Sequence, residues 1–319
     1  QSAVLVGIKV VVELIERYRG SLLGLAAGDA LGTTLEFKAP SSFTHLETIV
    51  GGGPFELEPG QWTDDTSMAL CLADSLIEKK GFDPQDQMER YCRWYDEGYL
   101  SSNGRCFDIG TTVRQALENF KRTGDPFANK DPNSAGNGSL MRLAPVPLFF
   151  ANDPVVAIEF SEQSSLTTHG SKEASDACRY YASLVIGALQ GRTKTELLSD
   201  GFAIAPGLWE KAPLEPKICD IAGGSFKQIE PIKLLGMGGY VVPSLHIALW
   251  AFFHTDNFRD GALMAVNVGK DADTYGAIFG QIAGAYYGEM GIPEDWRRVL
   301  AKREMIEQFA ERLRGFHRS

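Results

Sequence analysis

Apolar side chains recur every three to four residues along most of this chain, the spacing of one face of an α-helix. Strict alternation of apolar and polar residues, which marks a half-buried strand, is weak throughout. The pattern predicts helices over residues 8–30, 66–80, 85–97, 111–123, 154–163, 172–190, 243–253, 257–268, 274–289 and 293–315. Gly- and Pro-rich loops join them, chiefly at residues 40–60, 124–138 and 206–239. We therefore expect an all-α protein whose binding groups lie on loops held by a rigid helical scaffold.

Two of the predicted helices carry glycine at every fourth position. The two series are Gly20, Gly24, Gly28 and Gly32, and Gly276, Gly280, Gly284 and Gly288. Glycine weakens a helix, so such a series makes sense only where another backbone packs very closely. A membrane role is excluded because Asp29, Gln281 and neighbouring aspartates interrupt the apolar length. We expect both helices deep in the bundle and against each other, which would place Glu36 close to Asp271 and Asp273.

Two short acidic clusters begin predicted helices near opposite ends of the chain. They read Thr63-Asp64-Asp65-Thr66 and Asp271-Ala272-Asp273-Thr274. Either cluster alone is explained by helix capping, because Thr and Asp at a helix start satisfy free N–H groups. If folding brings the clusters together, four carboxylates meet and must stay protonated or be neutralised by cations. Oxygen ligands without a nearby Cys or His pair favour Mg²⁺ or Mn²⁺ over zinc.

Composition narrows the class of protein further. The chain has 319 residues, 44% of them hydrophobic and 23% charged, as in ordinary soluble globular proteins. Its net charge of −10 and pI near 5.1 argue against nucleic acid or an anionic membrane as partner. No linker or low-complexity tract divides the chain, so we expect one domain.

The cysteines and the start of the chain indicate a cellular compartment. The five cysteines, with no C-x-x-C pair, are Cys71, Cys92, Cys106, Cys178 and Cys219. Odd in number and widely spaced, they predict buried, reduced thiols rather than disulfides or a thiolate metal site. The apolar start is broken by Lys9 and Glu13 and lacks a signal-peptide cleavage pattern. These features favour a cytoplasmic protein.

Several motifs, taken in order, resemble those of the ADP-ribosylglycohydrolases, especially the bacterial dinitrogenase reductase-activating glycohydrolase and the ADP-ribosylarginine hydrolases. The matching stretches are Gly28-Asp29-Ala30-Leu31-Gly32 with Glu36-Phe37, Gly60-Gln61-Trp62 with the first acidic cluster, Phe107-Asp108-Ile109-Gly110, Gly136-Asn137-Gly138-Ser139-Leu140-Met141-Arg142, Thr168-His169, Gly239-Tyr240-Val241-Val242 and the second acidic cluster. The resemblance covers nearly the whole chain. It implies an all-α fold, a single compact orthogonal helical bundle over residues 17–319, with residues 1–16 as an N-terminal extension.

The resemblance also implies a chemistry, hydrolysis of the bond between ADP-ribose and a modified side chain, classically arginine, at a dinuclear Mg²⁺ or Mn²⁺ centre. By similarity, one metal is held by Thr63, Asp64 and Asp65, and the other by Asp271 and Thr274, with Asp273 bridging. Two hard cations suit this task because they grip vicinal ribose hydroxyls and lower the pKa of a bound water. A carboxylate must also move a proton at the glycosidic bond, and Glu36 and Asp108 are the candidates.

Two glycine-rich segments would hold the rest of ADP-ribose, with backbone amides for the diphosphate and a flat surface for adenine. The expected residues are Gly136, Asn137, Gly138, Ser139, His169, Gly238 and Tyr240. Tyr240 is proposed as the adenine platform on the family resemblance alone. The alternative for His169 is a helix cap or a packed ring.

One position departs from the family pattern, and more than one function is compatible with the sequence. The family usually has Gly-Gly before the second acidic cluster, whereas this chain has Gly269-Lys270, whose ammonium would either repel a cation or turn outward. The leading function is removal of ADP-ribose from arginine of an ADP-ribosylated protein. The alternatives are an immunity-type protein that occludes a cognate ADP-ribosyltransferase, a hydrolase of serine or O-acetyl linkages, and a dinuclear-metal hydrolase of phosphoesters.

Overall fold

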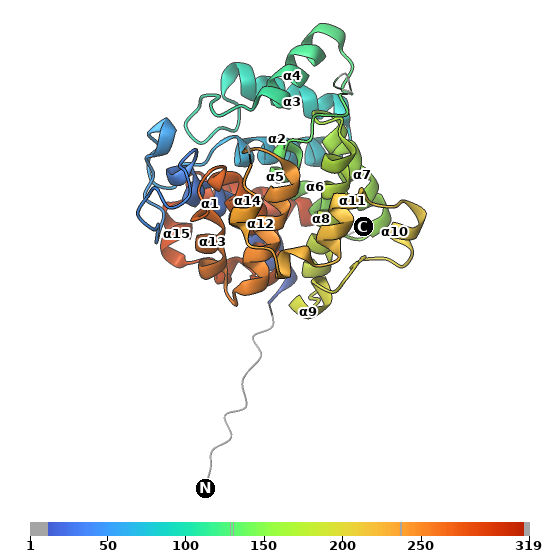
Figure 1. Ribbon diagram of the computed structural model, residues 1–319. Coiled ribbons are helices and arrows are strands. Elements are labelled where there is room, and N and C mark those ends of the chain that lie inside the picture. Colours follow the sequence, from blue (N-terminus) through green and yellow to red (C-terminus); the bar gives the residue numbers. More distant parts are fainter. Residues whose placement is uncertain (1–11, 128, 130, 237, 316–319) are drawn as a thin grey trace.

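The computed structural model describes residues 12–127, 129, 131–236 and 238–315 (Figure 1). The longer helices are α1 (Leu14–Gly32), α2 (Asp64–Lys79), α3 (Pro84–Glu97), α4 (Thr111–Thr123), α7 (Pro154–Leu166), α8 (Lys172–Leu189), α12 (Val241–His254), α13 (Phe258–Val266), α14 (Ala272–Tyr287) and α16 (Arg303–Gly315). Shorter ones are α5 (Gly138–Met141), α6 (Pro145–Phe149), α9 (Lys194–Leu197), α10 (Leu208–Lys211), α11 (Pro216–Ala222) and α15 (Glu294–Val299), with 3-10 turns η1 (Thr33–Leu35), η2 (Gly53–Phe55), η3 (Ser225–Lys227), η4 (Pro231–Lys233) and η5 (Glu289–Gly291). Within the described residues there are only isolated β-bridges and no strand. The predicted all-α fold is confirmed.

The two glycine series face each other along α1 and α14, which lie side by side near the middle of the molecule (Figure 1). A β-carbon on Gly28 would lie 1.9 Å from the carbonyl oxygen of Gly276, and one on Gly280 would lie 1.9 Å from that of Gly24. Real β-carbons never approach so closely, so the two backbones are in direct contact. Ser21 adds a hydrogen bond from its hydroxyl to the Gln281 carbonyl, at 3.0 Å. The predicted close packing of these two helices is confirmed.

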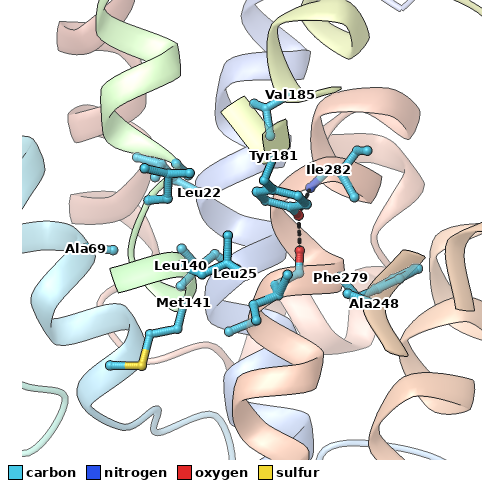
Figure 2. Close-up of a cluster of buried hydrophobic side chains, with 14 of the residues drawn as sticks. Leu22, Leu25, Ala69, Leu140, Met141, Tyr181, Val185, Ala248, Phe279 and Ile282 are labelled. Carbon is cyan, nitrogen blue, oxygen red and sulfur yellow. Dashed lines mark hydrogen bonds between the residues drawn. The ribbon is translucent and has the colours of Figure 1, made fainter. Parts of the chain in front are cut away.

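The remaining helices bury this pair on its other sides. Figure 2 shows Leu22 and Leu25 of α1 among side chains from α2, α5, α8, α12 and α14. The Tyr181 hydroxyl donates to the Ile278 carbonyl and accepts from the Ile282 N–H at 3.2 Å, which fixes α8 to α14. A buried phenol must find such partners, since an unpaired buried hydroxyl is unfavourable. The pair α1–α14 is therefore the rigid centre to which the site is attached.

Most predicted helix boundaries lie within three residues of the observed ones, and two differ more. The helix predicted over residues 8–30 begins at Leu14, and residues 8–11 lie outside the described part of the chain. The boundary predicted between residues 16 and 17 thus falls inside α1. The helix predicted over residues 293–315 is divided into α15 and α16 at Lys302, whose φ of 55° is left-handed. A left-handed residue cannot continue a right-handed helix, so the prediction of one helix was wrong there.

The cysteines agree only in part with the expectation of buried thiols. All five are free, but Cys219 is exposed and Cys92 and Cys106 are half-buried. Cys71 and Cys178 alone are buried. Among the described residues, no helix is both long and apolar enough to cross a bilayer.

Candidate active site

A cavity of about 1070 Å³ opens where the N-terminal ends of α2, α4, α5 and α14 converge. Its volume is at the upper end of the range of about 300–1,000 Å³ that ligand pockets occupy. Both acidic clusters, the Phe107–Arg114 segment and the Gly136–Gly138 segment contribute to its lining. Segments spread over most of the chain thus meet at one place, as the predicted site requires.

The two acidic clusters begin helices but do not cap them. Thr63 is the N-cap residue of α2 and Asp271 that of α14, and neither side chain accepts a capping hydrogen bond from a backbone N–H of its own helix. Capping alone therefore does not explain these residues, because their oxygens point to other partners. The glycine contact between α1 and α14 brings the clusters together.

Two groups of carboxylates form around Asp273. Ligand oxygens of Asp64, Asp65 and Asp273 lie within 4.8 Å of one another, and so do those of Glu36, Asp108 and Asp273. Asp273 is common to both groups. The predicted approach of Glu36 to the second cluster is confirmed. Asp271 and the hydroxyl of Thr274 lie beside these groups, with Thr274 Oγ1 3.5 Å from Asp65 Oδ2.

The carboxylates of the cluster are buried and repel one another, so a bound cation would stabilise them. Burial is the main cause that raises the pKa values of Asp64, Asp65 and Asp273 well above the usual range, and repulsion among neighbouring carboxylates adds to it. One oxygen of Asp65 and one of Asp273 are buried and have no hydrogen-bond partner in the described part of the chain. Orphaned carboxylate oxygens are costly unless a cation or proton satisfies them. The donor set contains no Cys or His, so it fits a hard divalent cation such as Mg²⁺ or Mn²⁺.

Asp29 holds the first cluster in place, a role that the sequence did not reveal. Its carboxylate accepts from the N–H groups of Thr63 and Thr66 at 2.9 and 3.1 Å, and from their hydroxyls at 3.0 and 2.6 Å. These bonds offset part of the burial that raises the Asp29 pKa to about 6. The signal that could have shown it is a charged residue inside the apolar glycine series of α1, where burial demands several partners.

The second cluster is held by the glycine-rich segments. Asn137 donates from Nδ2 to Asp271 at 2.6 Å and to the Ser244 hydroxyl at 2.8 Å. The N–H of Gly239 donates to the same Asp271 oxygen at 3.1 Å. Asp271 is absent from both close carboxylate groups, although it lines the cavity. Asn137 therefore orients an acidic residue as well as lining the cavity.

Glu36 and Asp108 form the second carboxylate group with Asp273. Burial is the largest cause that raises the Glu36 pKa, to about 11, and the Asp108 charge comes next. The Asp108 pKa rises less, to about 7, and burial is again the largest cause. Both carboxyl groups thus keep their protons to a higher pH than exposed carboxyl groups do. Asp108 has a left-handed backbone (φ 62°), a strained conformation that recurs at functional sites.

The other predicted binding residues divide into two sets. Gly136, Asn137, Gly138, His169 and Gly238 line the cavity. The Ser139 side chain is turned into the interior, where its hydroxyl accepts from Ser165 at 2.7 Å. Tyr240 is outside the lining, and its hydroxyl donates to Glu173 at 2.6 Å and accepts from Lys217 at 2.8 Å. The structure thus brings five of the seven together at the cavity.

Lys270 occupies a left-handed position in the loop that precedes α14. Its φ is 58°, after 79° at Gly269, and glycine tolerates such values better by about 1 kcal/mol. The Lys270 N–H donates to the Lys38 carbonyl at 2.8 Å, and its carbonyl accepts from Phe37 at 2.6 Å. Among the described residues, Lys270 forms no ion pair with a carboxylate. The Lys270 ammonium is therefore not an ion-pair partner of the carboxylates in the acidic cluster.

Aromatic residues also lie at the cavity, although the sequence did not predict a binding role for them. Phe37, Phe55 and Phe107 contribute to the lining, and the rings of Phe55 and Phe107 are 5.2 Å apart. Phe37 is 67% exposed. Single exposed aromatics carry no periodic signal, so only the fold could place them together.

Metal-free protein should lose stability as the pH rises from 5 to 8. Asp108 has its pKa raised from 3.8 to about 7 on folding, so the folded state binds more protons than the unfolded state in this window. The free energy of unfolding then falls with rising pH, and the Asp108 contribution is lost by the time the pH passes about 7. The measurement is the melting temperature in chelator at pH 5, 6, 7 and 8. Asp108→Asn should reduce the slope, and an unchanged slope would contradict this assignment.

Known proteins are similar to this chain in sequence and in fold. The ADP-ribosylglycohydrolase family pattern matches residues 11–318. ADP-ribosylarginine hydrolase Tri1 of Serratia proteamaculans is 41% identical over 94% of this chain and 80% of its own. The ADP-ribosyl-[dinitrogen reductase] glycohydrolase of Rhodospirillum rubrum is 32% identical over 89% of this chain and 90% of its own. A solved structure, an ADP-ribosylglycohydrolase-related protein complex, is 43% identical and superposes with a TM-score of 0.83 over 95% of this chain and 99% of that one. This chain belongs to the ADP-ribosylglycohydrolase family.

Proposed function

We propose that this protein hydrolyses the N-glycosidic bond between ADP-ribose and an arginine side chain of a modified protein. The observation that carries the proposal is the buried pair of carboxylate groups that share Asp273, set in a cavity of nucleotide size. Two relatives that match most of this chain are named for removing ADP-ribose, one of them from arginine. An acidic cavity also suits a guanidinium leaving group, which is cationic.

The cluster would hold two divalent cations, Mg²⁺ or Mn²⁺. Thr63, Asp64 and Asp65 would hold one and Asp271 and Thr274 the other, with Asp273 shared. Bound cations would supply the positive charge that the cluster lacks and Lewis acidity toward ribose hydroxyls and water. The orphaned oxygens of Asp65 and Asp273 support this assignment, since no described residue forms a hydrogen bond with them.

Glu36 and Asp108 would move the proton. Hydrolysis adds water across the bond: the hydroxyl joins the ribose anomeric carbon, and the remaining proton goes to the departing guanidine nitrogen. One carboxyl must accept a proton from water or give one to nitrogen, and groups with raised pKa values suit this exchange near neutral pH. The raised values of Glu36 and Asp108 support both as candidates.

The far side of the cavity would hold the diphosphate and adenosine. Gly136, Gly138 and Gly238 allow close approach to a ligand because they have no side chain. Tyr240 would contribute indirectly, because its hydrogen bonds to Glu173 and Lys217 anchor the segment that carries Gly238 and Gly239. Adenine stacking on Tyr240 would require that anchor to open.

The test is incubation of the protein with peptides ADP-ribosylated on arginine or on serine, with Mg²⁺, Mn²⁺ or chelator. We expect ADP-ribose release from the arginine peptide only, and only with metal. Release from serine peptides alone would reassign the linkage. No release from either, with metal shown to bind, would overturn the proposal.

Glu36→Gln should lower kcat by about 10²–10⁴-fold with little change in the affinity for ADP-ribose. Glutamine keeps the shape and hydrogen-bonding capacity of Glu36 but cannot exchange a proton. The measurement compares single-turnover rates with calorimetric binding of ADP-ribose. If kcat is unchanged while Asp108→Asn is inactive, Asp108 is the group that moves the proton.

A further inference from the structure

Arg142 is a buried cation without a carboxylate partner. Its side chain is fully buried, and it forms no ion pair among the described residues. Arginine is almost never fully buried unless paired, because its charge loses its hydration. Such a residue needs a compensating role, and the active site described above does not use it.

The two terminal nitrogens of the guanidinium donate to neutral oxygens alone, and Nε is buried without a hydrogen-bond partner among the described residues. The terminal nitrogens donate to the Gly138 and Ser164 carbonyls at 3.2 and 3.1 Å, and to the hydroxyls of Thr167 and Thr168 at 3.3 and 2.8 Å. The Tyr91 ring lies 4.8 Å from its central carbon. The hydrogen bonds of Arg142 thus reach Gly138, a cavity residue, and Thr168, which precedes the cavity residue His169.

Thr168 sets the proton position on His169. Its hydroxyl oxygen lies 2.8 Å from His169 Nδ1. Arg142 can only donate to that oxygen, and His169 Nδ1 is the only acceptor within reach of the Thr168 hydroxyl proton among the described residues. The hydroxyl therefore donates to Nδ1, and a neutral imidazole must then carry its proton on Nε2.

The Nε2 side of His169 faces the cavity wall. A β-carbon on Gly136 would lie 2.9 Å from Nε2, and one on Gly138 would lie 2.9 Å from Cε1, so the ring is packed on both glycines. His169 is 2% exposed and lines the cavity, and its Nε2 has no hydrogen-bond partner among the described residues. Burial first, and the Arg142 charge second, lower the His169 pKa to about 3, which keeps the ring neutral.

We propose that Arg142 and Thr168 are positioning residues that fix His169 as an Nε2–H donor to an anionic oxygen of ADP-ribose. This rests on the proposed function for the ligand alone. Five carboxylates line the metal end of the cavity, so a diphosphate needs donors and positive potential at the other end. Arg114 and Lys270 line the cavity, and the Arg142 charge adds positive potential from behind the wall next to His169, where the hydroxyl of Thr168 links it to the imidazole.

Nitrogen-15 spectra of the imidazoles and calorimetric titration with free ADP-ribose test this relay. The wild-type protein should show His169 as the Nε2–H tautomer, with His169→Gln used to assign the signal. Thr168→Val should mix the tautomers and weaken ADP-ribose binding about 10-fold, the effect of losing one charge-assisted hydrogen bond. Thr168→Ser restores the hydroxyl and should restore both results.

Thr167→Val is the matched control. It removes a neighbouring hydroxyl that also accepts from Arg142 but does not contact His169. The control should leave the tautomer unchanged and ADP-ribose affinity within about twofold. An Nδ1–H tautomer in the wild type, or equal effects of Thr167→Val and Thr168→Val, would overturn the relay. The tautomer can be measured even if the protein proves inactive on arginine, so failure of the proposed function is distinguishable.

Discussion

Replacing Asp273 by asparagine should abolish ADP-ribose release and reduce affinity for divalent cations by more than about 100-fold. Asp273 is common to both carboxylate groups, and it is also the ligand that the two proposed cation positions would share, so its loss would remove a ligand from each position. The same change removes a buried, self-repelling charge, so the metal-free variant should melt at a higher temperature than the metal-free wild type. Calorimetry with Mn²⁺ and thermal melts in chelator measure the two effects.

Asp295→Asn is the control for this change. Asp295 also lies in the first turn of a helix, but it is exposed and remote from the cavity. It should leave metal affinity and activity at wild-type values. Activity of Asp273→Asn near wild type would contradict the shared-ligand assignment. An immunity-type protein that only occludes an ADP-ribosyltransferase would keep its protection in this variant, so the same substitution separates catalysis from occlusion.

Gly280→Ala should destabilise the fold by more than about 3 kcal/mol, or prevent soluble expression. Helix propensity alone predicts the opposite sign, since alanine favours a helix by about 1 kcal/mol over glycine. Contact decides the outcome: the new β-carbon would lie 1.9 Å from the Gly24 carbonyl oxygen and 2.3 Å from its carbon. Backbone atoms of a packed helix cannot rotate away as a side chain does. The measurement is the free energy of unfolding in urea.

Gly81→Ala is the matched change. No atom lies within 4 Å of the place that a β-carbon on Gly81 would take, and its φ is not positive. The substitution should alter stability by less than about 0.5 kcal/mol. A Gly280→Ala variant as stable as Gly81→Ala would show that α1 and α14 can separate. That result would also remove the basis for the meeting of the two acidic clusters.

The meeting of the acidic clusters followed from the sequence because glycine spacing is a local signal with a long-range meaning. Two series of four glycines at every fourth position, in a chain with charged residues inside both helices, are best explained by close packing of the two helices. Close packing of the helices in turn brings together the residues near their ends. Polar residues before apolar runs similarly predicted helix starts at residues 66 and 274, two residues after the observed starts at Asp64 and Ala272.

What the sequence left undetermined depends on packing between distant segments. The four hydrogen bonds of Asp29 and those of Arg142 could not be predicted from residue spacing, because their partners lie on other elements. The orientations of Ser139 and Tyr240 likewise depend on neighbours, and so family motifs alone placed them in a cavity that they do not line. The division between α15 and α16 depends on one left-handed lysine, which propensity does not anticipate.

The α1–α14 contact has a consequence for how the protein is made. Ser21 and Gln281, which are bonded across it, are 260 residues apart in sequence. At synthesis rates of about 5–20 residues per second, α1 waits at least ten seconds or so for its partner to be translated. During that interval its small, apolar surface has nothing to pack against, so the nascent chain should depend on chaperones until the last helices emerge. Divalent-cation binding would then require that both acidic clusters have been synthesised and have folded together, because neither cluster alone carries a complete ligand set.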